Sequence, residues 1–206
     1  MERRIESRSW ALALVVAAIA GVSCVPVWSA RPIATKADKD VVRTMAGEWI
    51  LPVDPDARGD SDSLSLSMLP GKTSVFRYRS QGNLETWSVT PIRIGDHVFA
   101  DIRLLTTRVD SLTVETWSVP ADTLKKFHLI ARLTVRLDSL VVGFLDDDKT
   151  ARWLLDHPDQ VHAASVDEHG TDLTLLDGTQ QVRDFLKAVQ DEDALFEPPL
   201  VLVRAR

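Results

Sequence analysis

The clearest pattern of hydrophobic and polar positions lies in residues 128–148, where two apolar runs flank a turn at Leu137-Asp138-Ser139. In the first run, apolar residues recur at every second position and share one face: Leu129, Ala131, Leu133 and Val135. A period of two is typical of a strand with one buried face. The segment therefore predicts a β-hairpin at the centre of the fold.

Shorter runs with the same alternation predict more strands, separated by turns rich in Gly, Pro, Asn and Asp. The predicted strands cover residues 49–53, 63–69, 73–80, 84–94, 97–105, 110–119, 161–166, 171–176 and 200–205. Helical spacing predicts helices over residues 36–46, 149–156 and about 179–190, with Thr179 as the N-cap of the last. The fold class is therefore mainly β. We expect an antiparallel meander that forms a barrel or a strongly curved sheet, with two short helices in the C-terminal third.

One short sequence occurs twice. Glu-Thr-Trp-Ser-Val stands at 85–89 and again at 115–119, and a proline follows each copy. The repeat indicates either a duplicated strand pair or two edge strands with similar demands. Two copies are too few for a solenoid.

The amino-terminal segment is organised like a bacterial export signal. A basic start containing Arg3, Arg4 and Arg8 precedes 13 apolar residues, 10–22, a length that suits a signal-peptide core better than a membrane span. The only cysteine, Cys24, follows in Ala-Gly-Val-Ser-Cys. This arrangement resembles a lipobox, which implies that Cys24 is diacylated and becomes the first residue of the mature protein.

Two other outcomes stay open for the leader. Ordinary signal peptidase would recognise Ala18-Ile19-Ala20 and release a soluble secreted or periplasmic protein, and an uncleaved leader would remain as an anchor. The lipobox interpretation divides the chain into a signal peptide (1–23), a lipidated tether with a short helix (24–46) and a single barrel-like domain (47–206). It predicts a membrane-anchored lipoprotein of the bacterial cell envelope.

Composition and charge narrow the function classes. The chain is 45% hydrophobic and 26% charged, an ordinary globular balance. Its net charge is −6; the segment before Cys24 contributes +1, so the remainder carries −7. An acidic domain is a poor nonspecific binder of nucleic acid, so we expect no such partner. With one cysteine, the domain has no intramolecular disulfide.

Motifs for chemistry are scarce in this sequence. It contains no Gly-x-Ser-x-Gly, no phosphate-binding glycine loop and no His-Glu-x-x-His. Residues 54–62 only partly match a calcium loop, since Arg58 occupies a ligand position. The run Asp146-Asp147-Asp148 is better interpreted as a helix cap than as a metal site. We expect no metal and no cofactor, and we assign no catalytic residue.

Two sets of side chains are candidates for binding. The first is a polar face on two strands that we expect to pair: His97, Asp101, Arg103, His128 and Arg132. It forms either a polar acid–base site or the solvated outer side of the sheet, with cross-strand charge pairs. The second set is aromatic and either lines a barrel cavity or packs the core: Trp49, Phe76, Tyr78, Trp87, Trp117 and Phe144.

A resemblance to known proteins adds to this prediction. Gly47-Glu48-Trp49 looks like the Gly-x-Trp opening of lipocalin-type barrels. Further features are His128 with its apolar strand, Leu145-Asp146 before the Trp153-Leu154-Leu155 helix, the Asp184-Phe185-Leu186 helix, and Phe196-Glu197-Pro198. Through these features, residues 47–204 resemble a group of uncharacterised bacterial envelope lipoproteins. The resemblance implies a shared lipocalin-like fold and brings no activity with it.

Three functions follow as hypotheses from the sequence. The first is a noncatalytic envelope lipoprotein that binds a small apolar ligand. The second is a structural or protein-interaction module of the cell envelope with a packed barrel. The third is a hydrolase that uses His97 and His128.

Overall fold

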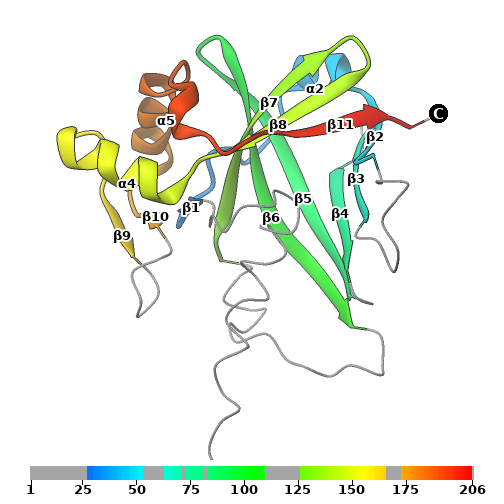
Figure 1. Cartoon of the computed structure of the whole chain (residues 1–206), viewed down its shortest axis with the longest axis horizontal. Coiled ribbons are helices and arrows are strands. Elements are labelled where there is room, and N and C mark those ends of the chain that lie inside the picture. The colour runs from blue at the N-terminus through cyan, green and yellow to red at the C-terminus, as the bar shows by residue number, and fades with distance from the viewer. Residues whose placement is uncertain are drawn as a thin grey trace, which may run out of the picture.

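A closed barrel of eight antiparallel strands dominates the protein (Figure 1). We describe it from a computed structural model, which covers residues 27–52, 63–70, 73–80, 83–109, 126–165 and 173–205. The barrel strands are β2 (Gly47–Ile50), β3 (Ser63–Met68), β4 (Ser74–Ser80), β5 (Asn83–Ile94), β6 (His97–Val109), β7 (His128–Arg136), β8 (Ser139–Phe144) and β11 (Leu200–Arg204).

The order of strands around the barrel is β6-β5-β4-β3-β2-β11-β8-β7, and pairing of β6 with β7 closes the ring. Successive strands from β2 to β8 are neighbours, as in a meander, whereas β11 returns to lie between β8 and β2. The mainly β prediction is confirmed, and the sheet is a barrel rather than an open curved sheet. The hairpin predicted in residues 128–148 is formed by β7 and β8, with Leu137 and Asp138 as its loop.

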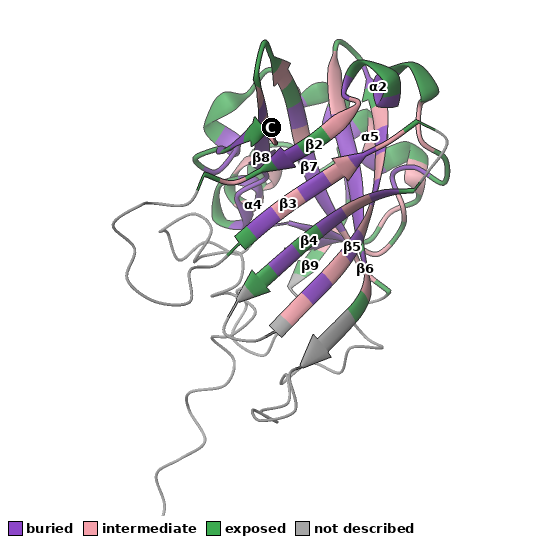
Figure 2. Ribbon diagram, turned by 90° about the vertical axis from the view of Figure 1, so that its right-hand side faces the viewer, coloured by how far each residue is buried: buried purple, intermediate pink, exposed green. Residues whose placement is uncertain are grey.

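The barrel interior is filled by the side chains that alternation predicts. Figure 2 shows buried and more exposed residues alternating along β3 and β4. The inward faces of β6 and β7 are apolar, and Ala100, Ala131 and Leu133 on them are buried. Burying apolar surface at about 25 cal/mol per Å² is the main force that stabilises such a core.

A second hydrophobic core lies outside the barrel wall. There, α4 (Asp147–Asp156), α5 (Thr179–Ala188), β9 (Ala163–Ser165) and β10 (Leu173–Leu175) gather on one side (Figure 1). Phe99 of β6 and Ile130 of β7 point outward and are fully buried beneath this layer. The short helix η1 (Asp193–Leu195) completes the layer.

The amino-terminal part of the described chain is built into the fold. Trp28–Ser29 form β1, which pairs antiparallel with β7 and parallel with β10. Val27 and Ile33 are fully buried in the second core. Residues 27–34 are thus packed against the domain, so the prediction of a tether is wrong for them.

The helix predictions are confirmed with one correction. Asp146 caps α4, because its Oδ1 accepts a hydrogen bond from the backbone N–H of Lys149 (2.9 Å). This capping is the role that we predict for the aspartate run. Thr179, however, is not the cap of α5; Gly178 occupies that position, and the Thr179 hydroxyl donates to the carbonyl of Pro32 (2.7 Å).

Several expectations fall outside the described residues. These are Cys24 and the leader, the loop 54–62, Trp117, and the second copy of the repeated sequence at 115–119. No helix in the described ranges is long and apolar enough to cross a membrane.

Candidate functional site

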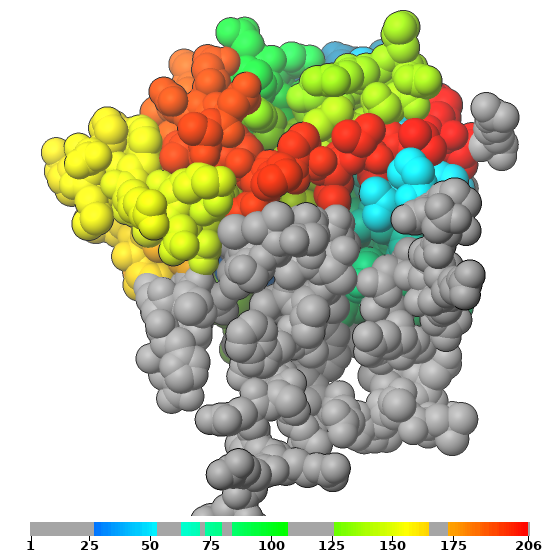
Figure 3. Space-filling model, viewed as in Figure 1, coloured from blue at the N-terminus to red at the C-terminus, as the bar shows by residue number. Residues whose placement is uncertain are grey.

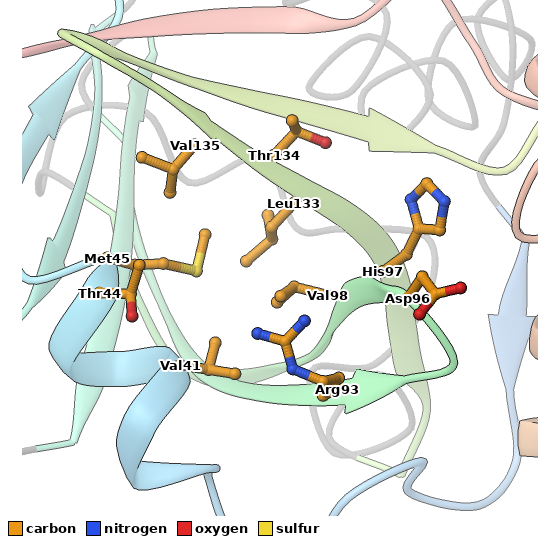
Figure 4. Close-up of a pocket in the computed structure, with 10 residues that line it drawn as sticks. All are labelled: Val41, Thr44, Met45, Arg93, Asp96, His97, Val98, Leu133, Thr134 and Val135. Carbon is orange, nitrogen blue, oxygen red and sulfur yellow. The ribbon is translucent and has the colours of Figure 1, made fainter.

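A pocket of about 330 Å³ lies at the end of the barrel that carries α2 (Lys39–Thr44). It opens between α2, the β5–β6 hairpin and the end of β7 (Figure 4). The lining residues are Val41, Thr44, Met45, Arg93, Asp96, His97, Val98, Leu133, Thr134 and Val135. The volume lies near the lower end of the range for small-molecule sites, about 300–1,000 Å³.

Strand register explains one wall of the pocket. Arg93 of β5 is the partner of Val98 of β6, and Val98 is the partner of Leu133 of β7. Because paired residues point to the same face of a sheet, these three side chains form one row on the inner wall. Val135 follows Leu133 on the same face, so apolar groups surround a single arginine.

The opposite wall is the helix α2, which several contacts hold in place. Asp38 caps the helix, and its backbone N–H donates to the carbonyl of Pro91 on β5 (2.9 Å). At the other end, the indole Nε1 of Trp49 donates to the carbonyl of Met45 (3.1 Å). These bonds fasten both ends of a helix that is too short to be stable alone.

Trp49 is in turn covered by an arginine from the last strand. The guanidinium carbon of Arg204 lies 4.6 Å from the centre of the Trp49 ring, and its Nη1 donates to the carbonyl of Ala46 (3.3 Å). Gly47 lies beside them with φ of 145°, and a Cβ there would approach Arg204 Nη1 to 3.1 Å. Glycine is therefore needed at this position, where the chain enters the barrel.

The rim of the pocket is formed by the tip of the β5–β6 hairpin. Gly95 turns the chain with φ of 58°, and the Gln190 side chain packs against it so closely that a Cβ would clash at 2.1 Å. The same side chain accepts a hydrogen bond from the N–H of Asp96 (3.1 Å). His97 Nε2 lies 2.9 Å from Asp191 Oδ1, so its partner belongs to the segment after α5.

The polar face that we predict on β6 and β7 does not form one cluster. Asp101 is buried and lies 2.7 Å from His128 Nδ1, so these two do meet. Yet His97 precedes by six residues the position on β6 that lies opposite His128, which separates the two histidines by about 20 Å along the sheet. The two histidines therefore do not lie within reach of one another, as an acid–base site that uses both would require.

The alternative of a solvated outer face is also wrong for Asp101, which is buried. The second carboxylate oxygen of Asp101 accepts hydrogen bonds from the N–H groups of Ile33 (2.7 Å) and Ala34 (3.4 Å). This aspartate fastens the amino-terminal segment to the barrel. Arg103, beyond the covering layer, is exposed.

Arg132, on the same outward face of β7, contacts the segment that follows α5. It donates to the carbonyl of Gln190 (2.7 Å) and to Asp193 Oδ1 (2.5 Å), and its guanidinium carbon lies 3.9 Å from the centre of the Phe196 ring. Its contacts hold the segment after α5 against the barrel.

The aromatic residues that we predict as cavity-lining candidates pack inside the barrel core, as far as the structure describes them. Each described member is no more than 8% exposed, and none lines the pocket: Trp49, Phe76, Tyr78, Trp87 and Phe144. All five belong to the barrel-interior cluster. Among the pocket-lining residues, only His97 belongs to a predicted candidate set. The others were missed because they belong to segments up to 94 residues apart in sequence, and most of them are small or aliphatic.

One chemically unusual residue was also missed. Glu85 faces the barrel interior beside Trp87, is 2% exposed, and accepts a hydrogen bond from Trp87 Nε1 (3.2 Å). Burial raises the pKa of this carboxyl to about 7, although the indole hydrogen bond acts in the opposite direction. Its position in the period-two pattern, among inward apolar residues, is a signal that could have identified it.

The pocket has the composition of a binding site. Its lining combines aliphatic side chains, the polar residues Thr44 and Thr134, and the guanidinium of Arg93. Within the described ranges, no group of three or more His, Cys, Asp or Glu side chains is arranged to hold a metal ion. No protein-family model, curated protein or solved structure matches the chain.

Proposed function

We propose that this protein is a noncatalytic, lipid-anchored binding protein of the bacterial cell envelope with a lipocalin-like barrel. Its ligand is a small, largely apolar molecule, and its binding site is the pocket at the α2 end. The anchor is the lipobox cysteine, Cys24.

The single observation that carries the proposal is the pocket itself. It reaches the inner barrel wall at Val98 and Leu133, which are apolar, and it is open to solvent between α2 and the β5–β6 hairpin. A largely apolar concave site with a few polar groups is the usual form of a small-molecule site. The helix and hairpin that bound it are fastened by hydrogen bonds of 2.9–3.1 Å, so the site is preformed.

Native mass spectrometry of the protein purified from its own host tests both parts of the proposal. We expect a diacylated Cys24 and a small co-purifying molecule. The variant Val135→Phe fills the pocket and is expected to lose the bound molecule. Val201→Phe makes the same change on the outer wall, where the side chain is 46% exposed, and should retain it. A wild-type protein without a ligand, or equal occupancy in both variants, contradicts the proposed site.

A second candidate function has its own observation. Three exposed apolar side chains lie together on the outer barrel wall: Ile50 (41%), Val201 (46%) and Val203 (36%). Val203 is the register partner of Ile50, and β11 crosses the face seen in Figure 3. Such a patch favours a protein-interaction module. In that case Val203→Asp should abolish cross-linking to an envelope protein in intact cells, whereas Val135→Phe should not.

A further inference from the structure

Arg93 is the only basic residue that projects from the inner wall of the α2-end pocket, among the residues that line it. The inward positions before it on β5 are Glu85, Trp87, Val89 and Pro91, all buried. Arg93 at the next inward position is exposed, so it stands where the barrel interior opens into the pocket.

The Arg93 guanidinium is available to a ligand. In Figure 4 it points into the space between Val41 of α2 and Val98 of β6. It makes no hydrogen bond or ion pair with any residue that the structure describes. The neighbouring pocket residues Val41 and Val98 are aliphatic, so the charged group is presented beside an aliphatic surface.

The other ionisable side chains that line the pocket, Asp96 and His97, do not pair with the Arg93 guanidinium. Asp96 stands at the tip of the hairpin, and its carboxylate is turned away from the cavity in Figure 4. His97 is already engaged by Asp191 through its Nε2 (2.9 Å). Among the described residues, a ligand inside the pocket thus meets one cation without an ion-pair partner, the Arg93 guanidinium, beside aliphatic side chains.

We infer that the ligand is a small amphipathic monoanion, a carboxylate with a short apolar chain, whose carboxylate binds Arg93. This inference rests on the proposed function of the pocket. The chain packs on Val41, Met45, Val98 and Leu133, while the guanidinium donates paired hydrogen bonds to the carboxylate. A singly charged head group suits the rim better than a doubly charged phosphate, because Asp96 and Asp191 lie nearby.

Three ligands of equal chain length test the head-group chemistry on the full-length protein: octanoate, octanol and octylammonium. Calorimetry gives the affinity, and methyl NMR of methionine gives the location. Met45 lines the pocket, whereas Met68 is fully buried in the barrel and serves as the internal reference. We expect octanoate to shift the Met45 signal alone and to bind about fivefold to tenfold more tightly than octanol. Octylammonium should bind most weakly.

Two variants assign the preference to one side chain. Arg93→Gln should bring the affinity for octanoate down to that for octanol. Arg103→Gln removes the same charge from an exposed position on the neighbouring strand and should leave the preference intact. Equal binding of octanol and octanoate by the wild type overturns the inference but leaves the proposed function standing. If none of the three ligands shifts Met45, the proposed pocket function itself fails.

Discussion

The buried carboxyl of Glu85 gives the sharpest prediction about stability. This residue faces the barrel interior, where the described chain places no cation within ion-pair distance of it. Burial disfavours the charged form, which raises the pKa from 4.5 to about 7. The folded protein therefore binds a proton at Glu85 more tightly than the unfolded chain does.

The sign and size of the effect follow from linkage. Folding is unaffected by this group below pH 4.5, where both states are protonated. Between pH 4.5 and about 7 the unfolded state ionises and the folded state does not, so stability falls; above about pH 7 both states ionise and the loss levels off. A rise in pKa from 4.5 to about 7 corresponds to a loss of about 3 kcal/mol at pH 8.

The variant Glu85→Gln measures this loss of stability, because glutamine cannot ionise. The amide has nearly the same shape, and its oxygen can still accept the hydrogen bond from Trp87 Nε1. In urea unfolding we expect the variant to be more stable than the wild type by about 3 kcal/mol at pH 8 and by less than about 1 kcal/mol at pH 5.

Glu48→Gln provides the matched control, because Glu48 is exposed on β2. Its stability difference from the wild type should not change with pH in the same way. A pKa raised by burial is contradicted if Glu85→Gln is less stable than the wild type at pH 8, or if the stability difference is the same at both pH values.

Three further predictions concern contacts that fasten the outer layers. Asp101→Ala should lower the free energy of unfolding by about 2–4 kcal/mol and speed hydrogen exchange of the backbone amides that the carboxylate binds. Arg204→Ala should lower it by about 1 kcal/mol, through loss of the contact with Trp49, and is measured by thermal unfolding. Burial acts to raise the pKa of Asp146, but hydrogen bonds from Lys149 outweigh it, so the pKa is lowered. Asp146 thus stabilises the fold at neutral pH and less as the pH falls. Asp146→Asn should therefore flatten the loss of stability towards low pH, measured by urea unfolding from pH 7 to 3.

Neutral changes at exposed positions set the baseline for these measurements. Asp96→Ala and Arg103→Ala remove charges that make no side-chain ion pair in the described chain, so each should change stability by less than about 0.5 kcal/mol. If Asp101→Ala is as mild as Asp96→Ala, the buried carboxylate does not hold the amino-terminal segment. If Asp146→Asn keeps the wild-type acid sensitivity, another group causes it.

The sequence by itself determined the elements of this protein. Alternation with period two located strands β3 to β8 within a few residues, and helical spacing located α4 and α5, because burial of one face is a local property of a chain segment. The inward face of β7 was identified in the same way. The two-residue strand β1 could not be found, since so short a segment carries no periodic signal.

Only the tertiary structure decided which surfaces are covered and where a pocket forms. Asp101 has an ordinary place on an outward face; it becomes a buried anchor because Ile33, 68 residues away, folds against it. Arg93 becomes a pocket residue because register sets it in a row with Val98 and Leu133, below α2. These contacts join segments far apart in the chain, and a pattern within one segment carries no information about the distant segment that packs on it.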